Sequence, residues 1–400
     1  MRLSSGINNN VYDEQFALGI AIEGVWEQFC KRKKAFNGDR GSSWNFPIYR
    51  LLVPATDTLS QTSDVTPVTF EDDNVSISLA EYGNAVRRAV MVEATAFTDT
   101  TKAMSKLIAI NRAESIELLV RAQFSGGSRV YRPSGVARTS LTRSTAAHLL
   151  TDDNLHNIRA MAAHGRMPRM DDGSFAAIIP DSLAASVQVE TAWLTAAQYN
   201  LGGKSGLDLV TGEIGQLAGV RFVVSPWGKM YWGGGTAAQA ATTTTAAVAA
   251  GAVQVTVTSA TGLAVGNYIL VGTKEAVDSE AVQITSIASS PTLDILGIGN
   301  DEVSNTGFKF AHASGAAVTE GENVGALILV GPDAVGKVWS SITGSNGKTA
   351  VTVPSLAVPE RFTDFSWRLI AGYGRIRNWG MIRAEFATPF DTLGYTEALP

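Results

Sequence analysis

The sequence contains little charge. Aspartate, glutamate, lysine and arginine make up 17% of its 400 residues, against roughly a quarter of an ordinary soluble domain. Glycine, alanine, serine and threonine are abundant instead. Such a surface is either lined by neutral β-strands or covered by partners, because the cores of protein interfaces are depleted of charge. Both explanations remain open at this level.

Cysteine and long apolar runs are also missing. Cys30 is the single cysteine, so no intrachain disulfide can form, and the chain suits a reducing cytosol. No run of about 18 apolar residues occurs, which excludes a membrane-spanning helix, and residues 1–10 lack the apolar core of a signal peptide. The apolar fraction of 45% is too high for a disordered chain. We therefore expect a folded cytosolic protein of two or three domains.

Common motifs of enzymes and metal sites are absent from the sequence. The four histidines share no metal-ligand spacing such as H-x-x-x-H; they are His148, His156, His164 and His312. No G-x-S-x-G hydrolase motif occurs. The loop Gly344–Thr349 is similar to a phosphate-binding loop, but Ile342 takes the position of its first glycine and a strand-like segment follows. We predict no catalytic residue, no cofactor and no metal.

A helix is predicted over Tyr12–Lys34, and it ends in four cations: Lys31, Arg32, Lys33 and Lys34. The helix dipole favours cations at this end, so the run can be a solvated helix end. Four adjacent cations can also meet several phosphates, so a contact with nucleic acid or an acidic partner is the alternative.

A β pattern follows over Phe46–Leu79. The apolar segment Ile48–Val53 and the alternating apolar residues within 75–79 enclose Thr56–Pro67, which has the composition of a turn. This predicts a long hairpin. A two-stranded ribbon is marginally stable alone, so we expect another subunit to supply the surface on which it packs.

A long helix is predicted over Thr98–Phe124, about 40 Å at 1.5 Å per residue, and Gly126 and Gly127 end it. The stretch from the end of this helix onward is basic, with no acidic residue between Arg121 and Arg143. Its five arginines are Arg121, Arg129, Arg132, Arg138 and Arg143. Such a basic loop contacts phosphates or the carboxylates of a neighbouring chain, and a solvated loop is the alternative.

Helices and strands alternate from residue 152 to 226, which indicates a mixed α/β domain. The predicted elements are a helix over Asp152–His164 capped by Asp152 or Asp153, a strand over Phe175–Ile179, a helix over Asp181–Asn200 and a strand over Val220–Val224. A further strand over Ala326–Val330 is expected to pair beside Val220–Val224.

An inserted β-module is predicted within this domain. Thr236–Gly251 is interpreted as an Ala/Thr-rich linker. Four short strands follow, namely Val253–Thr258, Tyr268–Val271, Val282–Ile287 and Leu293–Ile298, a spacing typical of a small sandwich or barrel. Residues 236–323 carry a net charge of −6 and the rest of the chain +1, which indicates a separate domain.

In this order the elements resemble the major capsid proteins of tailed bacteriophages, which share the Hong Kong 97 phage fold, and within them the coat-protein branch of the N4-type phages. Five segments carry the resemblance: Glu81–Val86, Lys102–Phe124, Gly212–Ser225, Leu329–Ala334 and Trp367–Gly374. It covers nearly the whole chain except the insertion.

The resemblance implies an α+β fold of named parts. These are an N-arm (1–45), an extended loop (46–96), a peripheral domain (97–149) with a spine helix (97–125), an axial domain (150–235 and 324–357), an inserted all-β domain (236–323) on the capsid exterior, and a return to the peripheral domain (358–400). Some members cross-link the shell through a lysine of the extended loop. Because Pro47–Thr101 contains no lysine, that bond cannot form here, and apolar packing is expected to hold the shell.

The function implied is structural and not enzymatic. The subunit would form hexamers and pentamers of an icosahedral shell around double-stranded DNA, in the virion, after assembly in the cytoplasm of the host bacterium. Expected partners are scaffolding, portal and decoration proteins, and no membrane. Candidate contacts with DNA or with other subunits are Lys31, Arg32, Lys33, Lys34, Arg129, Arg132, Arg138 and Arg143. Two alternatives remain: the shell of an encapsulin-like nanocompartment around a cargo enzyme, and a carbohydrate- or surface-binding protein that binds through its β-module.

Overall fold

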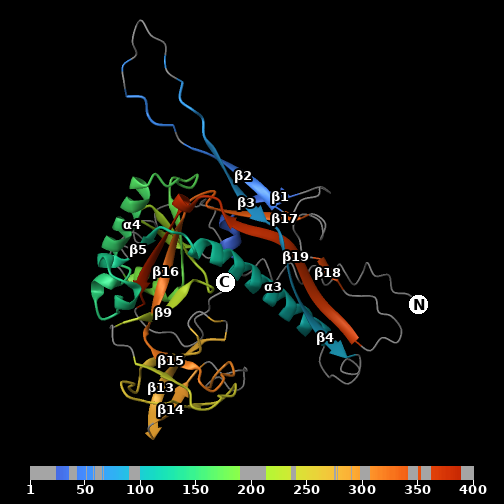
Figure 1. Cartoon of the computed structure of the whole chain (residues 1–400), viewed down its shortest axis with the longest axis vertical. Coiled ribbons are helices and arrows are strands. Elements are labelled where there is room, and N and C mark those ends of the chain that lie inside the picture. The colour runs from blue at the N-terminus through green and yellow to red at the C-terminus, as the bar shows by residue number, and fades with distance from the viewer. Residues whose placement is uncertain are drawn as a thin grey trace, which may run out of the picture. The chain divides into compact units, whose positions relative to one another are not determined.

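The computed structural model describes residues 24–35, 43–50, 52–56, 58, 65, 67–89, 100–189, 213–235, 240–273, 276, 278–289, 291–297, 307–340, 350–352 and 362–388. The fold is α+β, with few helices and many strands (Figure 1). The chain forms two units. One comprises residues 1–22, 30–112 and 335–376, and the other comprises residues 23–29, 113–334 and 377–400.

The first unit is built on a five-stranded sheet. Its strands are β1 (Lys31–Ala35), β4 (Ala80–Ala89), β17 (Val335–Ser340), β18 (Ala350–Thr352) and β19 (Phe362–Arg375). β4, β17 and β18 all pair antiparallel with β19, and β1 adds in parallel to β17. Alternate residues of β19, among them Phe365, Trp367 and Leu369, are buried, because successive side chains of a strand point to opposite faces.

The predicted hairpin is confirmed in this unit. β2 (Ser43–Tyr49) and β3 (Asp72–Ser78) pair antiparallel as a separate two-stranded sheet. Its base packs on the larger sheet through a small apolar cluster of Phe46, Ile77, Val338 and Ile376. The predicted long helix is confirmed as α3 (Thr100–Ser125).

The second unit contains a seven-stranded sheet. Its order is β5 (Val130–Tyr131), β20 (Met381–Ala387), β16 (Glu322–Val330), β6 (Phe175–Ile179), β8 (Val220–Val224) and β7 (Glu213–Leu217), with β9 (Met230–Gly234) also paired to β16. Helices α4 (Asp152–His164) and α5 (Asp181–Val189) pack on this sheet (Figure 1). Leu155, Ile158 and Ala162 of α4 are buried in that core, at the spacing of one helix face.

A six-stranded β-module lies within the same unit. Its order is β10 (Ala241–Thr243), β15 (Ala317–Glu320), β12 (Tyr268–Val271), β13 (Glu280–Ser289), β14 (Thr292–Leu296) and β11 (Gln254–Thr256). The two end strands meet, because Thr245 N donates to Thr256 O at 2.9 Å and Thr258 N donates to Thr243 O at 2.8 Å. The sheet therefore closes into a small barrel around its own apolar core. We call it the inserted barrel.

Two predictions about the N-terminal half and the inserted module were wrong. Lys31–Ala35 is strand β1 and not a helix end, and the 3-10 helix η1 (Trp26–Phe29) precedes it within the described residues 24–30. Pairing with β17 overrides the local helical pattern there; the rest of the predicted helix lies outside the described residues. The predicted linker contains β10, whose pairing with β15 makes it part of the inserted barrel.

Two smaller predictions also need correction. The N-cap of α4 is Thr151, whose side chain accepts a hydrogen bond from Asn154 N, so Asp152 and Asp153 lie in the first turn. β16 does not pair with β8, because β6 lies between them. Residues 190–200 of one predicted helix and the loop Gly344–Thr349 lie outside the described residues.

Candidate functional site

The hairpin of β2 and β3 exposes large apolar side chains. Six of them are between 59% and 82% exposed: Tyr49, Leu52, Val53, Val65, Val68 and Phe70. The rings of Tyr49 and Phe70 lie 5.2 Å apart across the hairpin. Large apolar side chains exposed together are a feature of interaction sites. We call these six residues the hairpin surface.

Ion pairs beside the hairpin surface join its two strands. Arg50 lies between two carboxylates, with Nη1 2.9 Å from Glu71 Oε2 and Nε 2.9 Å from Asp73 Oδ2. All three side chains are more than half exposed, so the pairs add little to stability. Their geometry instead favours one register of the hairpin.

The basic run Lys31–Lys34 lies in β1. Its backbone pairs with β17, Lys31 opposite Gly336 and Lys34 opposite Trp339. Lys31 is half-buried and Arg32 is exposed, while the side chains of Lys33 and Lys34 lie outside the described residues. Contact of this run with DNA or another subunit stays a prediction.

Arginines of the loop after α3 meet a buried carboxylate of their own chain. Glu385 in β20 has no exposed surface. Arg138 binds it in a fork, with Nη2 2.6 Å from Oε1 and Nε 2.9 Å from Oε2, and Arg132 Nε donates to Oε2 at 2.7 Å. Arg383 Nε lies 3.0 Å from Oε1. We call Glu385 and these three arginines the arginine cluster.

The arginine cluster keeps Glu385 ionised and carries excess positive charge. Burial alone would raise the pKa of Glu385, but hydrogen bonds from Arg138 and Arg132 and the charges of Arg138 and Arg383 outweigh burial and lower it. The Arg138 guanidinium also lies 3.7 Å from the centre of the Tyr231 ring, and Lys229 Nζ lies 5.1 Å from it. Three arginines therefore surround one carboxylate.

Arg129 contacts backbone carbonyls. Its Nη1 donates to Trp379 O and its Nη2 to Met161 O, both at 3.1 Å. Met161 belongs to the last turn of α4, where a cation also suits the helix dipole. Arg129 thus joins α4 to the segment before β20.

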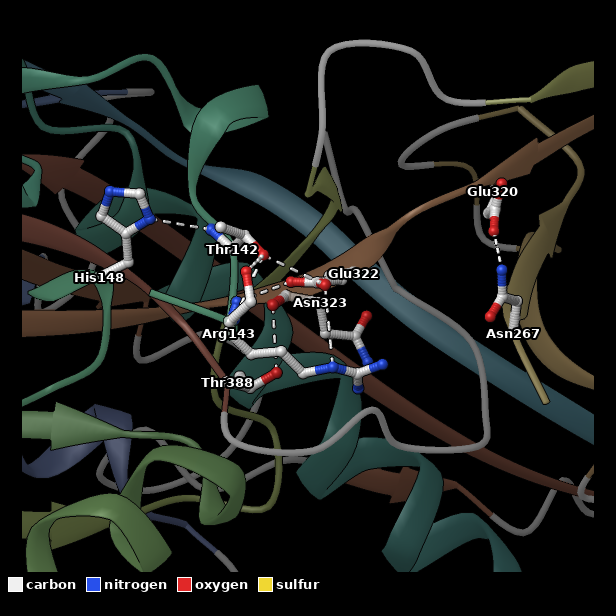
Figure 2. A network of polar contacts seen from close by, with 9 residues as sticks. Thr142, Arg143, His148, Asn267, Glu320, Glu322, Asn323 and Thr388 are labelled. Carbon is white, nitrogen blue, oxygen red and sulfur yellow. Dashed lines mark hydrogen bonds and ion pairs between the residues drawn. The ribbon is translucent and has the colours of Figure 1, made fainter. Parts of the chain in front are cut away.

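Arg143 and its neighbours hold the end of the inserted barrel (Figure 2). Glu322, the first residue of β16, accepts hydrogen bonds from Arg143 N at 2.8 Å and from Thr142 Oγ1 at 3.4 Å. The Arg143 side chain adds an ion pair, with Nε 3.7 Å from Glu322 Oε1. Thr142 N in turn donates to His148 Nδ1 at 3.1 Å. The loop therefore holds the carboxylate at the point where the chain leaves the barrel.

Further contacts fasten the inserted barrel to the seven-stranded sheet. Trp232 of β9 packs on Leu270 and Ala281 of the barrel, and its Nε1 donates to Thr319 O at 3.2 Å. Within the sheet, next to this junction, Asn323 O of β16 accepts from Thr388 Oγ1 at 3.1 Å (Figure 2). Trp232 of the sheet thus fastens the barrel at its base.

Two solved phage capsids have a fold similar to that of this chain. No family model and no curated protein matches the sequence. The capsid of cyanophage Pam1 matches over 91% of this chain and 89% of that chain, with a TM-score of 0.53 and 12% identity. The capsid of Ralstonia phage GP4 matches over 92% of each chain, with a TM-score of 0.51 and 10% identity. The chain has a phage capsid fold.

A buried glutamate on the long helix of this capsid fold holds the segment before β1. Glu117 is 2% exposed, and its Oε2 accepts from Val25 N and Trp26 N at 2.9 Å each. Trp26 is fully buried, and its Nε1 donates to Ser225 Oγ at 3.0 Å. Burial raises the pKa of Glu117 to about 7, against the lowering effect of the hydrogen bonds from Trp26 and Val25.

Sequence reasoning did not find Glu385 and Glu117. A signal for Glu385 was present, because it is the one acid in the apolar strand Met381–Ala387, and buried acids need partners. The loop that is rich in arginine and contains no acid supplies two of the partners that this buried acid needs. Glu117 gave no such signal, since its partners are backbone N–H groups.

The part of the chain that the structure describes contains neither a metal-binding cluster nor a membrane-spanning helix. There, no group of three or more His, Cys, Asp or Glu side chains is placed to hold a metal ion. Among the described helices, none is long and apolar enough to cross a membrane.

Proposed function

We propose that the chain is the major capsid protein of a tailed bacteriophage, with the Hong Kong 97-like fold and in the branch of the N4-type coat proteins. It assembles into hexamers and pentamers of an icosahedral shell that encloses double-stranded DNA, and it has a structural and no enzymatic role. Assembly takes place in the cytoplasm of the host bacterium, with scaffolding, portal and decoration proteins as partners, and the product is the virion.

The hairpin surface is the observation that carries this proposal. Its six exposed apolar side chains lie at the end of β2 and in the segment between β2 and β3, and they are not covered within the subunit. In a shell of identical subunits, each ribbon can cover itself on a neighbouring copy, and burial contributes about 25 cal/mol per Å² of apolar area. The low charge of the whole sequence fits a protein whose surface is largely interface.

Sedimentation velocity on the purified full chain tests the proposal, with nuclease treatment beforehand and negative-stain imaging of the fastest fraction. We expect closed particles of megadalton mass, or pentamers and hexamers. A stable monomer of 42.2 kDa, also after co-expression with a candidate scaffolding protein, would contradict it. Particles that hold an enzyme and no DNA when purified from the native host would favour the nanocompartment.

The parts of the capsid subunit are proposed as follows. The β2–β3 hairpin is the extended loop, α3 is the spine helix, and the seven-stranded sheet with α4 and α5 forms most of the axial domain. The inserted barrel is the added domain on the exterior. Because Pro47–Thr101 has no lysine, the shell is held without a covalent bond from this loop, so subunits from dissolved particles should migrate as single chains under denaturing conditions.

Two groups of basic residues are candidate contacts with DNA or other subunits, first Lys31–Lys34 and second the four arginines Arg129, Arg132, Arg138 and Arg143. Arg132 and Arg138 are held by Glu385, Arg129 by backbone carbonyls and Arg143 by Glu322. Arg132 and Arg138 remain candidates through the excess positive charge of the arginine cluster, and Arg129 and Arg143 remain candidates on the sequence pattern alone. Changing all four residues of 31–34 to glutamine tests the first group. Unchanged assembly together with unchanged DNA content would remove these residues from the proposal.

A further inference from the structure

The hairpin leaves the five-stranded sheet at a defined point. β4 pairs with β19 from Ala89 opposite Phe362 to Ala80 opposite Ala371. The next residue of β19, Gly372, has no partner in β4, because β4 begins at Ala80. The residues just before β4 belong to β3, which ends at Ser78. Within the described residues, β3 forms ladder hydrogen bonds with β2 alone. Packing, and not sheet pairing, therefore holds the base of the hairpin on the larger sheet.

A patch of glycines lies under this base. Gly336 of β17 stands opposite Gly374 of β19, and Gly372 stands opposite Val338 in the same ladder. Ile77 of β3 contacts the positions where all three glycines would carry a Cβ. A Cβ on Gly374 would lie 2.8 Å from Ile77 Cγ1, and one on Gly336 would lie 3.1 Å from Ile77 Cδ1. Ile77 is 3% exposed, so it fills the space that the missing side chains leave.

The approach at Gly372 involves the backbone itself. A Cβ there would collide with the carbonyl oxygen of Ser78 and would lie 2.9 Å from Ile77 Cγ2. Real Cβ atoms essentially never come this close to backbone atoms that cannot move aside. Glycine at this position therefore allows the two backbones to cross at their observed separation.

We propose that Gly336, Gly372 and Gly374 form a socket for Ile77 that sets the direction in which the hairpin leaves the sheet, and so determines where the hairpin surface meets a second copy of the chain. This inference rests on the proposed function. Ile77 and the glycines act as positioning residues, since they lie at the base and not on the hairpin surface.

A small change at the socket should move the outer end of the hairpin by a large distance. An extended chain from Ser78 back to Val65 reaches about 40 Å at about 3.3 Å per residue. A tilt of about 5° at the base would then move the outer end by about 3.5 Å over that length, which is enough to misplace apolar side chains that must pack closely. A single added methyl group at the base can thus disturb assembly while the rest of the subunit keeps its fold.

The test compares two alanine variants and their rescue. A Cβ on Gly374 meets Ile77 side-chain atoms, whereas a Cβ on Gly372 also meets the Ser78 backbone. We expect Gly374→Ala and Gly372→Ala each to lower the yield of assembled particles at least tenfold. Adding Ile77→Ala should restore Gly374→Ala to within about threefold of Ile77→Ala alone, and should leave Gly372→Ala unassembled. Gly380→Ala is the matched control, because its Cβ would make only ordinary contacts of 3.4 Å or more.

A distance measurement on the unassembled subunit separates the socket from assembly itself. Spin labels at Thr56→Cys in the hairpin and Ala85→Cys in β4, both exposed positions, in a Cys30→Ala background, report the hairpin direction. We expect the label distance to shift in Gly374→Ala and to return in the double variant. Unchanged distance and unchanged assembly in Gly374→Ala, or equal rescue of both glycine variants, would overturn the socket. A wild-type chain that never assembles would overturn the proposed function, while the label distances would still decide on the socket.

Discussion

The hairpin and the inserted barrel are both built from short strands, yet they bury their apolar side chains differently. The barrel closes its end strands on each other and encloses a core in which Ile269, Leu293 and Phe308 have no exposed surface. The hairpin buries side chains at its base and leaves Val53 82% exposed and Phe70 64% exposed. The barrel covers its apolar side chains within its own chain, and the hairpin leaves several of its own uncovered.

Charged groups show the same contrast. Glu385 is fully buried and three arginines of its own unit surround it. Arg50 on the hairpin also has two carboxylates within 2.9 Å, but all of these groups are solvated. Water weakens the pairs of Arg50, whereas the carboxylate of Glu385 has no surface exposed to water. The contrast predicts which substitutions affect the folding of the subunit and which affect its assembly.

A phenylalanine in each element provides the strongest test. Phe308→Ala in the barrel should lower the free energy of unfolding by about 3 to 5 kcal/mol, because it leaves a cavity in a closed core. Phe70→Ala in the hairpin should change it by less than about 0.5 kcal/mol and should reduce the yield of particles. Urea unfolding and sedimentation velocity measure the two effects. Equal destabilisation by both variants would remove the distinction between the elements.

Removing the buried carboxylate is the next largest change. Glu385→Ala should cost at least about 3 kcal/mol, because it leaves three arginines near a buried site without their partner. Glu385→Gln keeps the shape and loses the charge, and should cost less than alanine. Thermal unfolding of both variants measures the order. A Glu385→Ala variant as stable as the wild type would mean that the arginines hold the loop through other contacts.

The sequence predicts local elements well and distant partners poorly. β6, β8 and β12 match their predicted bounds, because each is a short, mostly apolar run with turn residues on both sides. β1 was missed because its strand character comes from β17, some 300 positions later in the chain. No local pattern records such a pairing.

Charge counts show a similar limit at the candidate site. The net charge of residues 236–323 includes Glu280, which is fully buried and accepts hydrogen bonds from Lys309 N at 2.8 Å and Phe310 N at 2.9 Å. It also includes Glu322, which holds Arg143. The sequence gives the number of charges, whereas the fold decides which of them reach the surface. The exposure of the hairpin, in contrast, follows from its local pattern, because a two-stranded ribbon has no interior in which to bury side chains.

The buried carboxyl group of Glu117 in the second unit should make the stability of the subunit depend on pH. The pKa of Glu117 is about 7 in the folded chain, mainly because of burial, against an ordinary value of 4.5. The folded state therefore holds this proton more tightly than the unfolded state. Its contribution to stability is full below pH 4.5 and is lost as the pH rises to about 7, by about 3 kcal/mol in all. Glu117→Gln should remove that slope between pH 5 and pH 8 in urea unfolding, and an unchanged slope would contradict the assignment.

The smallest effect is expected at the ion pairs of the hairpin. Arg50→Gln breaks contacts to Glu71 and Asp73, but water replaces them at once because all three side chains are more than half exposed. The midpoint of thermal unfolding should stay unchanged, in contrast to the large loss in Glu385→Ala. Assembly should respond more than folding does, because desolvation against a second copy strengthens whatever charge pairs lie at the contact. Particle yield as a function of salt concentration measures this. If Arg50→Gln lowered the unfolding midpoint as much as Glu385→Ala does, the hairpin would be part of the folded core of the subunit, and its exposed side chains would need another explanation than a neighbouring copy.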